Sequence, residues 1–171
     1  MLSFRSFALI AASGLFGTAG HAQVMRELGV HEHGHVTLQV AISADAVEMV
    51  LEAPGADIVG FEHAPETDEQ VSAIDAARDA LSDPAAILVI PDAAGCAGGA
   101  AEIELHQEGG HAAFEVMHRL ACADTSAIVE IGTRLFDLYP SIEEIDVEYV
   151  TPAGQGAGEL EPGAALALPT S

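Results

Sequence analysis

The strongest constraint on the fold is a pair of alternating segments in the first third of the chain. From position 36 to 42, and again from 47 to 52, apolar side chains alternate with polar or small ones. This period of two is typical of β-strands with one buried face. Because Ala44 and Asp45 separate the two segments, we expect an antiparallel hairpin whose outer face carries Thr37.

The next stretch predicts a loop, a helix and a short strand. Residues 55–63 are expected to form a loop, and Thr67 to Gln70 has the form of a capping box. Apolar residues at helical spacing continue to Leu81, and Pro84 ends the run. Residues 87–90 are wholly apolar, which predicts a short buried strand.

The second half repeats this order. Alternation predicts strands around 103–105 and 114–120, followed by a helix over 125–138 that Pro140 ends. Strands are expected over 145–149 and within 157–168. The predicted helices and final strands of the two halves are offset by 58 positions. We therefore expect an α+β domain with an antiparallel sheet and two helices, arranged as two tandem ββαβ units; convergent packing of unrelated halves is the alternative.

The N-terminus has the pattern of a cleaved leader. Arg5 precedes the apolar run 7–16, and Gly20-His21-Ala22 places small residues where a signal peptidase cuts. We expect residues 1–22 to be a signal peptide and residues 23–171 to form one mature domain. No segment has the run of about 20 apolar residues that a membrane span needs, so a protein not embedded in a membrane is expected.

Charge and cysteine content narrow the classes of function. The chain has 27 Asp and Glu against five Lys and Arg, for a formal net charge of -22. Such a field repels phosphate backbones, so no nucleic-acid partner is expected, and it concentrates divalent cations; a solvated acidic surface is the alternative reason for the charge. In an exported chain the only two cysteines, Cys96 and Cys122, are expected to form a disulfide, with a thiolate metal site as the alternative.

A histidine cluster opens the mature chain. His31, His33 and His35 alternate, and a strand continued backwards from the hairpin puts them on the outer side with Thr37. Alternate residues of a strand lie about 6.6 Å apart, so neighbouring imidazoles can reach one metal ion. Zinc suits this donor set, and copper or nickel would also accept it. The alternative is a solvated N-terminal arm without a site.

The remaining histidines differ in what their positions suggest. His63 follows Glu62 in the expected loop and is the best additional ligand, with Glu62 either binding the ion or orienting a ring. His106 and His111 flank a Gly-rich connection; they are weaker candidates that solvated loop histidines explain equally well. His118 shares the parity of the apolar residues of its strand, which favours a hydrogen-bonded core histidine.

Several of these segments resemble a known family. The segment from His31 to Gly34, the hairpin end at 51–54, the block 60–65 (Gly-Phe-Glu-His-Ala-Pro) and the cysteine pair are similar to the ZrgA-like periplasmic zinc-binding proteins, over nearly the whole mature chain. The resemblance implies an accessory role in zinc acquisition, alongside an inner-membrane zinc importer or its binding protein. It also implies that His31, His33 and His63 occupy motif positions. Many members carry a long His/Asp-rich insertion that this chain lacks, which favours one ordered site over bulk scavenging.

Taken together, the patterns predict an exported protein that binds zinc through histidines, and the resemblance implies that it is periplasmic. The sequence lacks Gly-x-Ser-x-Gly, a phosphate-binding Gly loop and His-Glu-x-x-His, so we do not expect an enzyme. A hydrolytic zinc site with Glu62 as general base is a lesser alternative. The stronger alternative is a secreted interaction domain with incidental histidines.

Overall fold

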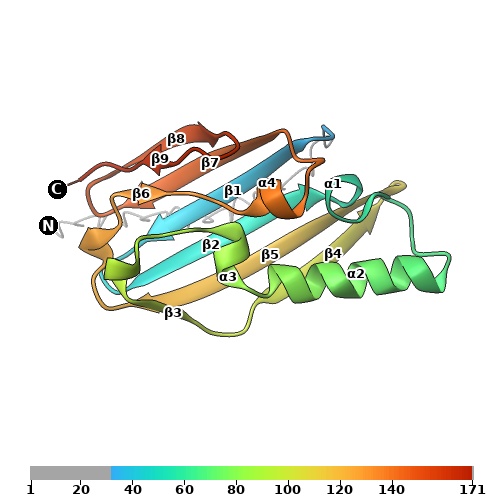
Figure 1. Ribbon diagram of the computed structural model, residues 1–171, viewed down its shortest axis with the longest axis horizontal. Coiled ribbons are helices and arrows are strands. Elements are labelled where there is room, and N and C mark those ends of the chain that lie inside the picture. The colour runs from blue at the N-terminus through green and yellow to red at the C-terminus, as the bar shows by residue number, and fades with distance from the viewer. Residues whose placement is uncertain (1–31, 171) are drawn as a thin grey trace, which may run out of the picture.

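A computed structural model of the chain describes residues 32–170. Strands dominate these residues, and one long helix accompanies several short ones (Figure 1). In chain order the elements are β1 (His35–Ile42), β2 (Ala46–Pro54), α1 (Gly55–Val59), α2 (Asp68–Leu81), α3 (Pro84–Ile87), the 3-10 turn η1 (Asp92–Ala94), β3 (Cys96–Gly98), β4 (Glu102–Glu108), β5 (His111–Cys122), the 3-10 turn η2 (Thr125–Ala127), β6 (Glu130–Ile131), α4 (Leu135–Leu138), β7 (Glu144–Thr151), β8 (Gly154–Leu160) and β9 (Leu166–Ala167).

The main sheet has the strand order β3-β5-β2-β1-β7-β8, and β4 also pairs with β5. The predicted hairpin is confirmed: β1 and β2 are antiparallel, with Leu38 opposite Leu51. The pairing of β1 with β7 is parallel, while β2–β5, β3–β5, β4–β5 and β7–β8 are antiparallel. The expected α+β class with an antiparallel-rich sheet is therefore confirmed.

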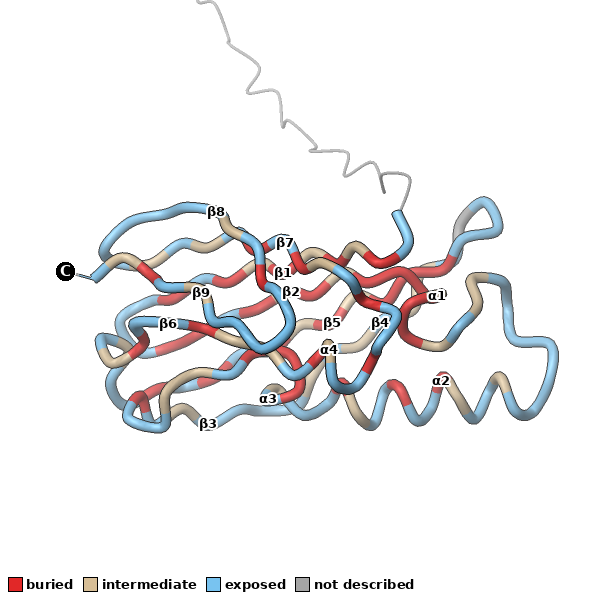
Figure 2. The backbone as a smooth tube through the Cα atoms, turned by 45° about the horizontal axis from the view of Figure 1, so that its top comes forward, coloured by how far each residue is buried: buried red, intermediate tan, exposed pale blue. Residues whose placement is uncertain are grey.

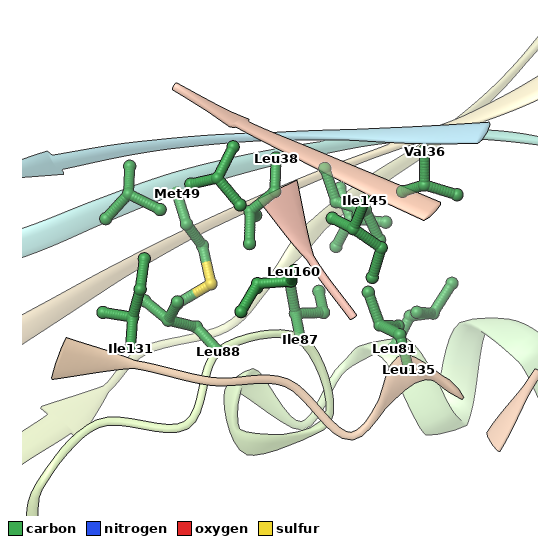
Figure 3. Close-up of a cluster of buried hydrophobic side chains, with 14 of the residues drawn as sticks. Val36, Leu38, Met49, Leu81, Ile87, Leu88, Ile131, Leu135, Ile145 and Leu160 are labelled. Carbon is green, nitrogen blue, oxygen red and sulfur yellow. The ribbon is translucent and has the colours of Figure 1, made fainter. Parts of the chain in front are cut away.

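One face of the sheet carries the core. Along β1 the even-numbered residues from Val36 to Ile42 are buried, and the odd-numbered ones are intermediate or exposed. Figure 3 shows Leu38, Met49 and Ile145 pointing from the sheet toward side chains of α2, α3 and β6. Burial of each such side chain stabilises the fold by about 1.5–3 kcal/mol. The packing thus leaves the opposite face of the sheet to the polar positions (Figure 2).

Helix α2 forms where the capping box predicts it. The backbone N–H of Gln70 donates to Thr67 Oγ1, and the side-chain oxygen of Gln70 accepts from the backbone N–H of Glu66. Ile74 and Leu81 are buried, and the helix ends before Pro84, as expected. Only one side of α2 faces the core, which matches its mixed apolar and charged sequence.

Two local expectations are wrong. Residues 55–59 of the expected loop form α1, which Gly60 ends in the left-handed conformation that favours glycine. The expected strand over 87–90 does not form. Ile87 is the last residue of α3, which begins where the Asp83 side chain accepts the N–H of Ala85 and Pro84 occupies the first turn. Ile87 and Leu88 are buried in the core, Ile90 is half-buried, and Val89 is exposed and makes only an isolated bridge to Gly132.

The expected helix over 125–138 is also wrong. This stretch forms η2, β6 and the single turn α4, because the backbone of Glu130–Ile131 pairs with β9 and Gly132 bridges to Val89. β-Branched residues around Gly132 make a helix less favourable there, and long-range pairing overrides the periodicity. With α3 in place of the first unit's final strand and no long second helix among residues 32–170, the tandem-repeat interpretation is not confirmed.

The far end of the sheet is fixed by the disulfide and by a core histidine. Cys96 and Cys122 face each other in the β3–β5 register and form the predicted disulfide. His118 is 4% exposed, and its Nε2 hydrogen-bonds to the carbonyl oxygen of Leu81, as predicted for a core histidine. The expected leader (1–22) lies outside the described residues. No helix within the described part of the chain is long and apolar enough to cross a membrane.

Candidate metal centre

Strand register brings the histidine-bearing segments to one end of the sheet. β1 begins at His35, which lies opposite Glu144 at the start of β7. The end of β2 at Pro54 pairs with Ala113 near the start of β5. The β4–β5 turn, which immediately precedes β5, therefore lies at this end of the sheet. Figure 1 shows the start of β1, α1 and the β4–β5 turn at the same end of the molecule. Residues almost 80 positions apart in the sequence therefore meet there.

Glu62 lies between two imidazoles at this end. Its Oε2 is 2.8 Å from His111 Nδ1, and its Oε1 is 3.3 Å from His33 Nε2. The Glu62 side chain is 13% exposed, whereas His33 and His111 are 65% and 64% exposed. Oε1 is buried without a hydrogen bond. Each oxygen of this mostly buried carboxylate therefore faces an accessible ring nitrogen, and Oε1 retains capacity to accept a hydrogen bond or to bind a cation.

A turn at Gly34 directs His33 toward Glu62. Gly34 has φ 88°, its N–H donates to Asp57 Oδ2 at 2.9 Å, and its carbonyl accepts from the N–H groups of Glu143 and Glu144. The strand begins only after this turn, at His35. The expectation that strand alternation would place His33 and His35 together is therefore wrong for His33. Each histidine has a different carboxylate partner.

Asp57 of α1 forms the buried floor of this end. Its carboxylate is nearly inaccessible and accepts the Gly34 N–H. Burial raises the pKa of Asp57, while the Gly34 N–H and the nearby His33 act to lower it and the charge of Glu62 raises it further. Two acidic side chains, Asp57 and Glu62, thus lie near His33.

A second group lies on the outer face, at the start of β1 and β7. His35 Nδ1 is 3.9 Å from Glu144 Oε1. His35, Glu144 and Asp146 each offer one ligand atom, and these atoms lie within 4.8 Å of one another. The expected outward direction of His35 agrees with this. No pattern in the sequence indicated Glu144 and Asp146, because the parallel pairing of β7 with β1 joins segments about 100 residues apart.

The other candidate histidines have partners of their own. His63 Nδ1 contacts the Ala64 carbonyl oxygen at 2.8 Å, and its ring lies 5.2 Å from that of Phe61. His106 Nε2 is 3.4 Å from Glu104 and 3.9 Å from Glu115. Within residues 32–170, no ion pair or hydrogen bond joins either histidine to Glu62. His31 lies outside the described residues.

The donor chemistry around Glu62 fits zinc. Imidazole nitrogens and carboxylate oxygens are both common zinc ligands, and two histidines with one carboxylate supply three of the four positions of a tetrahedral site. Two arrangements are open to these residues. Zinc can bind the Glu62 oxygens together with the rings, or it can bind the outward ring nitrogens while Glu62 orients the rings.

A comparison with known protein families identifies the family of this chain. Residues 30–167 match the family described as ZrgA family zinc uptake protein. The chain belongs to this family. The match spans most of the sequence and includes every element of the fold, which confirms the resemblance inferred from the motifs. A search of curated proteins found no significant match.

Proposed function

We propose that this ZrgA family chain binds zinc at the centre around Glu62, through His33, Glu62 and His111, and that it serves zinc acquisition. The single observation that carries the proposal is the buried Glu62 carboxylate, which contacts two exposed imidazoles from distant segments and keeps one oxygen without a hydrogen bond. His31 and His63, each close in sequence to one of these residues, are proposed as further ligands. Copper and nickel are possible competitors by ligand type.

Charge supports capture of a cation at this centre. Asp57 and Glu62 are both partly or wholly buried near His33, and the whole chain carries a formal net charge of -22. Burial lowers the local dielectric and strengthens the attraction of these carboxylates for a divalent ion. A field of this sign also raises the local concentration of cations.

The family and the disulfide support the proposed compartment and partner. A disulfide between Cys96 and Cys122 is typical of proteins in oxidising compartments, and the leader pattern at residues 1–22 agrees with export. We propose a periplasmic location and transfer of zinc to an inner-membrane importer or its binding protein. We also propose that the protein is not an enzyme and that residues 23–171 form its mature domain.

Native mass spectrometry of the mature, oxidised protein titrated with zinc tests the proposal. The wild type is expected to take up zinc in a saturable, stoichiometric step that weakens in acid, because protonated imidazole does not coordinate. His33→Ala with His111→Ala is expected to abolish tight binding at the Glu62 centre.

His106→Ala is the matched control, since His106 is also a partly exposed histidine paired with glutamates at this end of the sheet. Tight zinc binding that survives the double substitution, or that is lost equally in the control, would contradict the proposed centre. Absence of saturable uptake by the wild type would favour the alternative of an interaction domain with incidental histidines.

A further inference from the structure

We propose a second, weaker divalent-cation site on the outer face of the sheet, formed by His35, Glu144 and Asp146. The identity of the ion as zinc rests on the proposed function, but the site itself does not. One imidazole nitrogen and two carboxylate oxygens converge there to within 4.8 Å of one another. That spacing is close to what ligands around one ion require, since zinc–ligand distances are about 2.0–2.2 Å.

The backbone holds this group in place. His35 and Glu144 are register partners in the parallel β1–β7 pair, and Asp146 lies two residues further along the same face of β7. The Gly34 carbonyl accepts from the N–H groups of both Glu143 and Glu144, at 2.8 and 3.0 Å. The three side chains are therefore carried by rigid, hydrogen-bonded strands rather than by a loop, which reduces the entropy lost on binding an ion.

The outer face around the group is strongly acidic. Thr37 lies between Asp146 on β7 and Glu52 on β2, and the register continues from Glu52 to Glu115 and from Glu115 to Glu104. Adjacent strands are about 4.8 Å apart, and like charges directly opposite each other destabilise a sheet. Asp146 also lies opposite Glu159 on β8, and a cation bound beside Asp146 offsets part of that repulsion.

The site is separate from the Glu62 centre. His33 and His35 flank the Gly34 turn, and they contact Glu62 and Glu144 respectively. His35 and Glu144 are half-buried and Asp146 is exposed, so this group is more open to water than Glu62. One nitrogen ligand in place of two, together with greater solvent access, predicts weaker zinc binding than at the Glu62 centre.

Zinc titration with zinc chloride, followed by calorimetry and native mass spectrometry, tests the second site. The wild type is expected to bind two ions, the second at least about tenfold more weakly than the first. Glu144→Gln with Asp146→Asn, or His35→Ala alone, is expected to remove the weaker event and to leave the tighter one unchanged.

Glu102→Gln with Glu148→Gln is the matched control. It also removes two negative charges from strands β4 and β7 of the same sheet, outside the proposed ligand set. This control is expected to retain both ions. Loss of the weaker ion in the control as well would show that bulk charge alone attracts it and would overturn the site.

The combined outcomes separate this inference from the proposed function. A wild type that binds only one ion, lost with His33→Ala and His111→Ala, overturns the second site and supports the Glu62 centre. Two ions retained in the Glu144/Asp146 variant also overturn the second site. A wild type that binds only one ion, lost in the Glu144/Asp146 variant but unaffected by the His33/His111 change, supports the second site and contradicts the Glu62 centre. Circular dichroism of each variant confirms that it folds.

Discussion

The two ends of strand β5 use histidine in opposite ways. At its start, His111 is exposed and contacts the Glu62 carboxylate; seven residues later, His118 is buried and contacts the Leu81 carbonyl. Beyond His118, the strand ends at Cys122 in the disulfide. Binding groups therefore gather at one end of the sheet and stabilising groups at the other, so substitutions at the two ends should separate stability from zinc binding.

The largest expected effect is on stability, at the disulfide end. Cys96→Ser with Cys122→Ser opens a loop with a sequence separation of 26 residues. On the chain-entropy model this lowers the free energy of unfolding by about 3–4 kcal/mol. Urea denaturation measures the change. Zinc affinity of the folded fraction is expected to stay as in the wild type, and a parallel loss of affinity would break the separation between the two ends.

A somewhat smaller loss of stability is expected from His118→Ala. The substitution leaves a cavity in the core and removes the partner of the Leu81 carbonyl oxygen. The free energy of unfolding should fall by about 2–3 kcal/mol. Thermal unfolding measures this, with His111→Ala as the exposed comparison that should hardly change stability. Loss of zinc binding in the His118 variant would contradict its structural role.

Glu62→Gln should affect zinc rather than folding. The amide keeps the shape of the side chain but removes the charge next to His33 and His111. Zinc affinity is expected to fall by about 10- to 100-fold, while the apo protein keeps its stability or gains some because a mostly buried charge is removed. Calorimetry with zinc and urea denaturation of the apo form provide the two readings. Unchanged affinity would remove Glu62 from the centre.

The smallest expected effect concerns pH. Because burial raises the pKa of Asp57 above 3.8, the folded state holds this proton more tightly than the unfolded state. Stability from this group is therefore full below about pH 3.8 and is lost as the pH rises through the raised pKa. Asp57→Asn should remove this contribution to the change in the free energy of unfolding with pH. Urea midpoints of the apo protein between pH 3.5 and 7, with and without the substitution, measure it; identical slopes would contradict the raised pKa.

Patterns within a single segment, such as alternation or a helix cap, correctly predicted several elements. The β1–β2 hairpin, helix α2 with its Thr67 cap and strand β7 all follow from period or capping. The helix predicted over 125–138 was wrong because the spacing of its apolar residues is also compatible with short strands. Pairing of β6 with β9 favours the strand there. Likewise, no local pattern indicated α3, whose start depends on a single cap at Asp83.

The site was predictable in composition but not in grouping. His33, Glu62 and His111 were all candidates from the sequence, yet only the fold brings His111 rather than His63 into contact with Glu62. The turn at Gly34 likewise divides His33 from His35, which strand alternation alone would have joined. Glu144 and Asp146 were missed because their position depends on a parallel crossover between distant strands.

The most direct test of the central claim is a crystal structure of the zinc-loaded protein, with the ion located by anomalous scattering at the zinc edge. We predict a zinc ion within about 2.0–2.2 Å of ring nitrogens of both His33 and His111, with Glu62 bound to it or hydrogen-bonded to those rings. Zinc found elsewhere, with both rings uncoordinated, would contradict the account.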